Sequence, residues 1–124
     1  MAGKASPSFH VKRVYETPAE SDGLRVLVDR LWPRGLAKDK ARIDLWLKDI
    51  APSDDLRRRF HGAPEKWREF VAAYAKELNG ASARAAAETL CEHAGQTPVT
   101  LLYAARDEEH NNAVALKTLI ERSG

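Results

Sequence analysis

The chain has 124 residues, of which 44% are hydrophobic and 31% are charged, and its formal net charge is +2. This size and composition predict a globular domain with its own hydrophobic core, and no stretch approaches the roughly 20 apolar residues of a membrane span. The small net charge argues against a dedicated nucleic-acid binder, and the single cysteine, Cys91, excludes an internal disulfide and a cysteine-based metal site.

A single α/β domain is expected over residues 9–124, after a disordered N-terminal tail at residues 1–8. The tail is small and polar and lacks the hydrophobic segment of a secretory signal, so we expect a cytoplasmic protein. Loose apolar alternation over Phe9–Tyr15 predicts a first strand, and the β-branched run Leu24–Asp29 predicts a second. The turn formers of Thr17–Gly23 separate the two strands.

The middle of the chain is predicted to be helical. A short helix is expected over Asp39–Lys48, in which Trp46 is expected in the core or, with Lys48, at a rim. Ser53, followed by two acids, has the pattern of a helix N-terminus. Apolar residues recur at helical spacing over residues 67–78, which predicts a helix with one buried stripe, and an alanine-rich helix is expected over residues 82–94.

The continuous apolar run Val99–Ala105 predicts a strand that is buried on both faces, and a last helix is expected from Asp107, as its N-cap, to Arg122. The order β-β-α-α-α-β-α indicates an α/β fold with a small, mainly parallel sheet flanked by helices on both faces. The strands near residues 24–29 and 99–105 are expected to be adjacent and parallel.

Two segments follow predicted strands and are expected to meet at one edge of the sheet. Ligands of open α/β sheets bind beyond the carboxyl ends of the strands, and this places residues 29–35 beside residues 106–112. In the first segment, Arg30 and Arg34 offer planar, bidentate donors for a phosphate or carboxylate, and Trp32 offers a flat face for stacking. The structural alternative is an ion pair and a turn, with the indole covering the core.

The second segment contributes His110 and Asn111 to the same candidate crevice. His110 and Asp29 are the candidate catalytic residues, because either side chain could move a proton, and Asn111 is a candidate ligand-binding residue. Backbone N–H groups at the start of a helix favour an anion, whereas Glu108 and Glu109 would repel one. The structural alternative is that the imidazole is satisfied by partners within the protein.

No metal ion or cofactor is assigned from the sequence. His61 could join His110 and Asp29 in a set of two imidazoles and one carboxylate, but no short ligand spacing supports such a site. The sequence has no glycine-rich phosphate loop, Gly-x-Ser-x-Gly elbow or His-Glu-x-x-His string. The cofactor is therefore unknown at this stage.

Four strings, in this order along the chain, resemble the YeaO-like proteins, a bacterial group within the domain-of-unknown-function family 488: VLVDRLWPRG, LWLKDIAPS, PEKWREF and LLYAARDEEHNNA. The resemblance runs from about residue 10 to 121 and implies a compact α/β domain, with no established activity. Other branches of the family carry Cys-His-Arg where this chain has Asn111-Asn112-Ala113. The resemblance therefore implies no thiol-dependent role here.

Three functions are consistent with these residues. The first is an enzyme on an anionic small molecule, which Arg30 and Arg34 would hold in an anion-binding crevice. The second is an accessory domain that binds nucleic acid through the arginines and Trp32, although the net charge is modest. The third is a protein-interaction module without a ligand site, which is favoured if these three side chains have internal partners.

Overall fold

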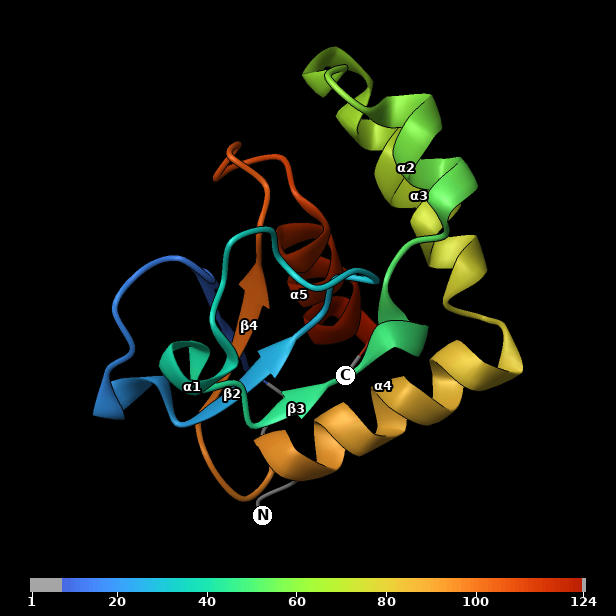
Figure 1. The fold of residues 1–124 in the computed structure, drawn as a ribbon. Helices are drawn as coiled ribbons and strands as arrows, with labels where there is room; N and C mark the ends of the chain where they lie inside the picture. The colour runs from blue at the N-terminus through green and yellow to red at the C-terminus, as the bar shows by residue number, and fades with distance from the viewer. Residues whose placement is uncertain (1–7, 124) are drawn as a thin grey trace.

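A four-stranded, all-parallel sheet organises residues 8–123, the part of the chain that the computed structural model describes (Figure 1). The strand order is β1-β4-β2-β3. The predicted α/β class with a small parallel sheet is confirmed, and the tail predicted at residues 1–8 lies outside the described residues except for Ser8. The strands are β1 (His10–Arg13), β2 (Leu24–Leu27), β3 (Leu45–Trp46) and β4 (Val99–Tyr103).

β2 and β4 are parallel neighbours, as predicted from the sequence. Leu27 of β2 pairs with Leu102 of β4, and along the other edge of β4, His10 of β1 pairs with Thr100. β4 is therefore an inner strand, and all five of its residues are buried. This position explains why its sequence is a continuous apolar run instead of an alternating one.

Four longer helices share one hydrophobic cluster with one face of the sheet. They bury Leu56, Tyr74, Leu90 and Leu116 in one cluster with strand residues that include Val26 and Leu101. Ser53 accepts a hydrogen bond from the backbone N–H of Leu56, as expected of the N-cap of the first of these helices. The helices are α2 (Asp54–Phe60), α3 (Trp67–Glu77), α4 (Ala81–Ala94) and α5 (Asn112–Ser123), and 3-10 turns occupy Glu20–Asp22, Lys48–Ile50 and Pro64–Lys66.

The opposite face of the sheet is covered differently from the prediction. A smaller cluster there contains Leu27 and Leu102 and is covered by side chains of residues 32–46, including Trp32 and Trp46. The single helix in this covering segment is α1 (Lys38–Ala41), one turn long, which lies to the left of the sheet in Figure 1. Helices of several turns therefore flank one face, and a mostly irregular segment covers the other.

The prediction of a helix over Asp39–Lys48 is wrong beyond the first turn, because α1 ends at Ala41. The backbone enters the left-handed region at Arg42 (φ 49°), and β3 follows. The N–H of Asp44 donates to the carbonyl of Arg25 (2.9 Å), and the N–H of Leu47 donates to that of Leu27 (3.0 Å). The open edge of β2 thus supplies hydrogen-bond partners that the local helical pattern did not anticipate.

Three charged residues form a network beside this smaller cluster. Asp22, only 7% exposed, accepts hydrogen bonds from Lys12 Nζ (3.1 Å) and from Arg25. Arg25 is 4% exposed and also donates to the carbonyls of Ala41 (3.0 Å) and Arg42 (3.1 Å). The buried guanidinium thereby attaches the end of α1 to the sheet.

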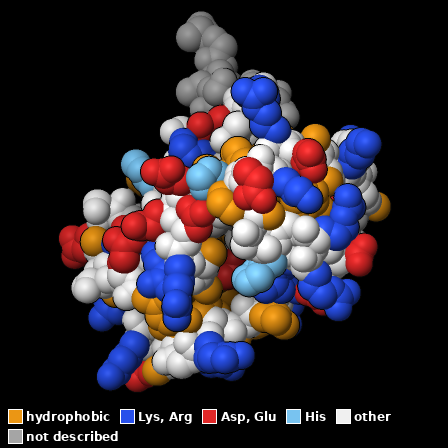
Figure 2. Space-filling view, turned by 90° about the horizontal axis from the view of Figure 1, so that it is seen from above, with side chains coloured by type: hydrophobic (Ala, Val, Ile, Leu, Met, Phe, Trp, Pro, Cys, Tyr) orange, Lys and Arg blue, Asp and Glu red, His pale blue; other side chains and the backbone are white. Residues whose placement is uncertain are grey.

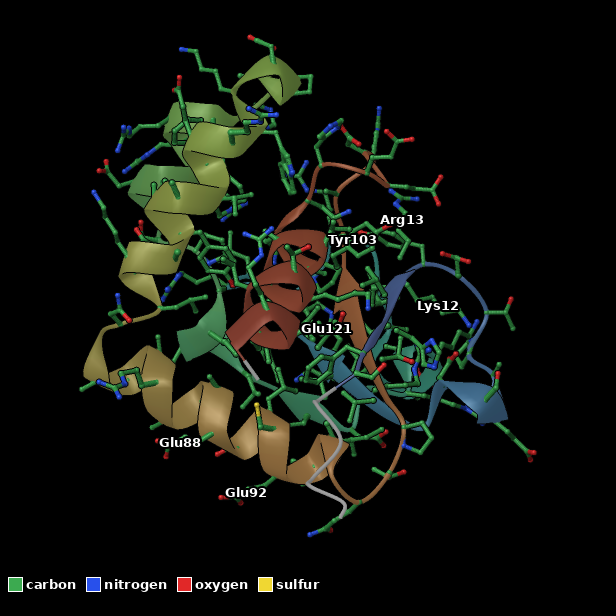
Figure 3. The ribbon with its side chains drawn as sticks, turned by 180° about the vertical axis from the view of Figure 1, so that it is seen from behind. Lys12, Arg13, Glu88, Glu92, Tyr103 and Glu121 are labelled. Carbon is green, nitrogen blue, oxygen red and sulfur yellow. The ribbon has the colours of Figure 1, made fainter. Side chains whose placement is uncertain are left out.

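Side-chain carboxylates bind backbone N–H groups at both ends of β1. The N–H of Phe9 donates to Glu121 on α5 (2.9 Å), and the N–H of Arg13 donates to Glu16 (3.0 Å). Figure 3 shows Glu121 on α5 and Arg13 near the segment that follows β4. Arg13 reaches that segment through a hydrogen bond from its Nε to the carbonyl of Ala105 (3.0 Å). In residues 8–123, no helix is long and apolar enough to cross a membrane.

Candidate functional site

Asp29 lies just beyond β2 and connects three parts of the fold. Its Oδ2 accepts a hydrogen bond from the N–H of Ala104 (3.0 Å), and its Oδ1 accepts one from Asn112 Nδ2 (3.0 Å). The same Asn112 amide donates to the carbonyl of Val28 (2.8 Å), and Trp46 Nε1 donates to the carbonyl of Asp29 (2.7 Å). Asp29 therefore joins the ends of β2 and β4 to the start of α5.

Burial raises the pKa of Asp29, and the hydrogen bonds from Asn112 and Ala104 and the charge of Arg57 offset only part of this effect. A raised carboxyl pKa is a property of general acids. Both carboxylate oxygens of Asp29, however, already accept hydrogen bonds from the protein. A catalytic role for Asp29 stays a prediction.

Arg30 is half-buried and binds the segment that leads into α2. Its Nη2 donates to the carbonyl of Ala51 (3.1 Å) and its Nε donates to that of Pro52 (3.4 Å). These bonds satisfy two backbone acceptors of a turn that has little room for water, since Ala51 and Pro52 are themselves buried. The proposed role of Arg30 as an anion ligand stays a prediction.

Arg34 differs from Arg30 because its side chain is exposed. Within residues 8–123 its guanidinium has no hydrogen-bond or ion-pair partner. The backbone of Arg34 is held in place by Tyr15, whose hydroxyl donates to the Arg34 carbonyl (2.7 Å). Of the two candidate arginines, Arg34 is the one whose donors remain available to a ligand.

Two tryptophans and two lysines form a continuous row over the smaller cluster. The ring centroids of Trp32 and Trp46 lie 5.5 Å apart in an edge-to-face arrangement, and Trp32 Nε1 donates to the carbonyl of Leu36 (2.8 Å). Lys38 Nζ lies 5.9 Å from the ring centroid of Trp32, and Lys48 Nζ lies 4.1 Å from that of Trp46. We call Lys38, Trp32, Trp46 and Lys48 the lysine–tryptophan row.

His110 has partners within the protein. Asp107 accepts hydrogen bonds from the N–H groups of Glu109 and His110 (both 2.9 Å), and its other oxygen lies 3.1 Å from His110 Nδ1. The hydrogen bonds from the N–H groups of His110 and Glu109 lower the pKa of Asp107. The imidazole also packs edge-on against Trp67 of α3, with centroids 5.3 Å apart. The role of His110 as a general base stays a prediction.

The last helix begins at Asn112, and the prediction that Asp107 is its N-cap is wrong. Asn111, 4% exposed, caps the helix instead: its Oδ1 accepts a hydrogen bond from the N–H of Val114 (2.9 Å). Asn111 Nδ2 donates to the carbonyl of Asp107 (2.9 Å). Four residues earlier, the Asp107 carboxylate caps the separate turn that contains Glu109 and His110. Two capping side chains, Asp107 and Asn111, therefore follow one another along the chain. Ligand binding by Asn111 stays a prediction.

The carboxyl ends of the strands face the viewer in Figure 2, where acidic and basic side chains are intermixed. Two hollows lie elsewhere: one of about 540 Å³ between α2 and α3, and one of about 320 Å³ beside β1. His61 is exposed at the end of α2. Among residues 8–123, no three His, Cys, Asp or Glu side chains are grouped to hold a metal ion, so the set of His61, His110 and Asp29 is not formed.

Sequence analysis missed two residues that matter here. Asn112 is the amide that bridges Val28 and Asp29, and no local pattern distinguishes it from Asn111 beside it. Lys38 was overlooked although a signal existed: residues 30–48 contain six arginines and lysines but only two acids. Counting charge by segment, instead of over the whole chain, would have drawn attention to this part of the surface.

Comparison with known proteins identifies the family. The family model described as "Inactive DUF488-N3 subclade" matches residues 8–123. The chain is 43% identical over 110 residues to an uncharacterized protein of Mycobacterium tuberculosis strain H37Rv, covering 89% of this chain and 91% of the relative. It is also 43% identical over 109 residues to the uncharacterized protein YeaO of Escherichia coli strain K12, covering 88% and 93%. No solved structure matches the chain significantly. The resemblance in the four motifs is confirmed, and the chain belongs to the YeaO-like proteins of the DUF488 family.

Proposed function

We propose that this protein is a non-catalytic domain that binds a polyanionic partner through residues 30–48. The observation that carries the proposal is the lysine–tryptophan row, in which each of two neighbouring indoles has a lysine ammonium near its ring, at 4.1 and 5.9 Å. Lys38 and Lys48 are exposed, and both indoles are half-buried. A partner can therefore contact both the charges and part of each ring.

Two of the side chains that a reaction at the strand ends would use, Asp29 and Arg30, hold the fold together. Asp29 bonds Ala104 and Asn112, and Arg30 bonds the carbonyls of Ala51 and Pro52. Withdrawing either group toward a substrate would leave its partners without these hydrogen bonds, at a cost of about 1–3 kcal/mol for each partner that is buried. This cost disfavours a reaction that depends on either side chain.

The family comparison agrees with a role that does not involve catalysis. The description of the matching family model contains the word "inactive". At the start of α5, this chain has Asn111 and Asn112, whose amides form a helix cap and a link between α5 and the end of β2. Neither amide is a nucleophile or a proton carrier at neutral pH.

Charge in residues 30–48 is strongly positive, although the whole chain carries only +2. Both acids in the segment, Asp39 and Asp44, are exposed, and Asp44 also accepts a hydrogen bond from the N–H of Arg25 (2.9 Å). The segment contains α1 and β3, which are drawn in the lower part of Figure 1. Such a patch attracts anions. Its exposed cations are Arg34, Lys38, Lys40, Arg42 and Lys48.

Retention on immobilised heparin tests the proposal. We expect the double variant Lys38→Glu/Lys48→Glu to elute at clearly lower salt than the wild type, because binding of a polyanion depends on displaced counterions. The matched control is Lys66→Glu/Lys76→Glu, which makes the same change in net charge at exposed positions near and on α3. The control should elute at a salt concentration slightly below that of the wild type and clearly above that of Lys38→Glu/Lys48→Glu. Equal losses in both variants, or no loss in either, would contradict the proposal.

A further inference from the structure

We infer that the partner of this surface is single-stranded nucleic acid. The inference rests on the proposed function and adds the class of partner to it. It is motivated by a repeat of cation–aromatic pairs, which matches a polymer whose repeat unit carries one anionic phosphate and one flat base.

Three such pairs adjoin one another. Two are the lysines and indoles of the lysine–tryptophan row. The third is Tyr15 with Arg13: the guanidinium carbon of Arg13 lies 4.8 Å from the ring centroid of Tyr15. The Arg13 guanidinium also donates to the carbonyls of Ala105 (3.0 Å) and Ala104 (3.4 Å), so in this pair the ring of Tyr15 is the part that is free to contact a ligand. The hydroxyl of Tyr15 bonds the carbonyl of Arg34, two residues after Trp32, so the third pair extends the row instead of standing apart from it.

The ring of Tyr15 is accessible to a ligand, and the two indoles of the row are half-buried. Tyr15 is 41% exposed, and Leu31, next to Trp32, is 62% exposed. These are the large hydrophobic side chains that are exposed in the described part of the chain. Lysine side chains are flexible, so an ammonium that covers a ring can move to a phosphate and leave the ring to a base. Aromatic side chains stack on any base, which makes such contacts tolerant of sequence.

Other polyanions fit these observations less well. An acidic protein segment or inorganic polyphosphate would use the cations but has no flat rings to place against Tyr15, Trp32 and Trp46. In a nucleic-acid duplex the base faces are stacked on one another, so they are not available to stack on the aromatic rings either. Single strands present unstacked bases and phosphates together.

Fluorescence anisotropy of a labelled dT12 oligonucleotide, at low ionic strength, measures the inferred binding. Unlabelled dT12, a 12-base-pair duplex, polyglutamate and inorganic polyphosphate serve as competitors at equal charge. We expect unlabelled dT12 to compete best. Tyr15→Leu should weaken binding of dT12 by roughly tenfold, as expected from the loss of one stacked base. Tyr15→Phe should keep most of the affinity, because it retains the ring.

Two further variants test whether a loss of affinity in Tyr15→Leu comes from the lost ring or from a folding defect. Trp67 lies outside the row, stacked on Phe70 with centroids 5.6 Å apart, so Trp67→Phe should leave dT12 affinity unchanged while Trp32→Leu weakens it. Circular dichroism verifies that each variant is folded. Competition by polyglutamate or polyphosphate as strong as that by dT12 would overturn the inference and leave the proposed polyanion-binding function intact. Failure of all four polyanions to bind would overturn both.

Discussion

Asp29 and Asn112 are 83 residues apart in the sequence, yet Asn112 Nδ2 lies 3.0 Å from Asp29 Oδ1 and donates a hydrogen bond to it. The same amide reaches the carbonyl of Val28 at 2.8 Å. One asparagine side chain therefore ties the first residue of α5 to the end of β2. This attachment occupies the position where a ligand would lie in many α/β proteins, at the carboxyl ends of the strands.

The first prediction concerns this attachment. Asn112→Ala should lower the free energy of unfolding by about 1–3 kcal/mol, because Asp29 and the carbonyl of Val28 each lose a donor. Urea denaturation of the variant and the wild type measures the difference. The exposed Gln96→Ala provides the control and should change stability by less than about 0.5 kcal/mol. A loss in Asn112→Ala no larger than that in the control would mean that the bridge contributes nothing.

The second prediction concerns the helix cap at Asn111. Asn111→Ala removes the acceptor for the N–H of Val114 and should cost about 1 kcal/mol. Asn111→Asp keeps an acceptor and adds a negative charge at the helix N-terminus, so it should recover most of this loss. Both variants lack the amide that donates to the carbonyl of Asp107, so the difference between them combines the restored cap, the added charge and the contact of the new carboxylate oxygen with that carbonyl. Equal thermal stabilities of the two variants would contradict the capping role.

The third prediction contrasts two arginines that look equivalent in the sequence. Arg30→Met should lower the free energy of unfolding by about 1–3 kcal/mol, because the carbonyls of Ala51 and Pro52 lose their donors, and should hardly affect retention on heparin. Arg34→Ala should do the opposite: its exposed side chain contributes under about 1 kcal/mol to folding, but its loss should reduce heparin retention. A reversed pattern would place Arg30 in the binding surface and Arg34 in the fold.

The fourth prediction is a pH dependence that arises from Asp22. Burial by itself would raise the pKa of this carboxyl, but hydrogen bonds from the N–H of Ala19 and from Lys12 and Arg25 outweigh burial and lower it. In the unfolded chain the pKa of an aspartate carboxyl is about 3.9, and above that pH the carboxylate of Asp22 stabilises the fold in full. That contribution is lost as the pH falls through the lower pKa of the folded state.

Asp22→Asn should consequently lower the free energy of unfolding by roughly 3–5 kcal/mol at neutral pH, because Arg25 stays buried without its carboxylate partner. The difference from the wild type should narrow progressively below about pH 4, where the Asp22 carboxyl of the unfolded wild-type chain begins to take up its proton. Asp54→Asn, which removes an exposed ion pair with Arg57, is the control and should cost less than about 1 kcal/mol. A difference for Asp22→Asn that stays constant from neutral to strongly acidic pH would refute the account.

Local sequence determined the features whose cause is itself local. The apolar run at Val99–Ala105 predicted the inner strand β4 because a strand covered on both faces can expose no polar residue. Ser53 predicted the start of α2 because an N-cap bonds an N–H group only three residues away. The four motifs identified the family, since they hold their order along nearly the whole chain.

Tertiary structure decided whatever depends on a partner far along the chain. Leu45–Trp46 became a strand, against a helical pattern, because the edge of β2 offered hydrogen bonds. Arg30 and Arg34 have the same chemistry in the sequence, and only the position of Ala51 and Pro52 separates a structural arginine from an exposed one. Trp32 and Trp46 likewise contact each other only because the segment that covers the smaller cluster folds back on itself. A hydrogen bond or a ring contact requires both of its members, and the sequence around either member alone does not contain the other.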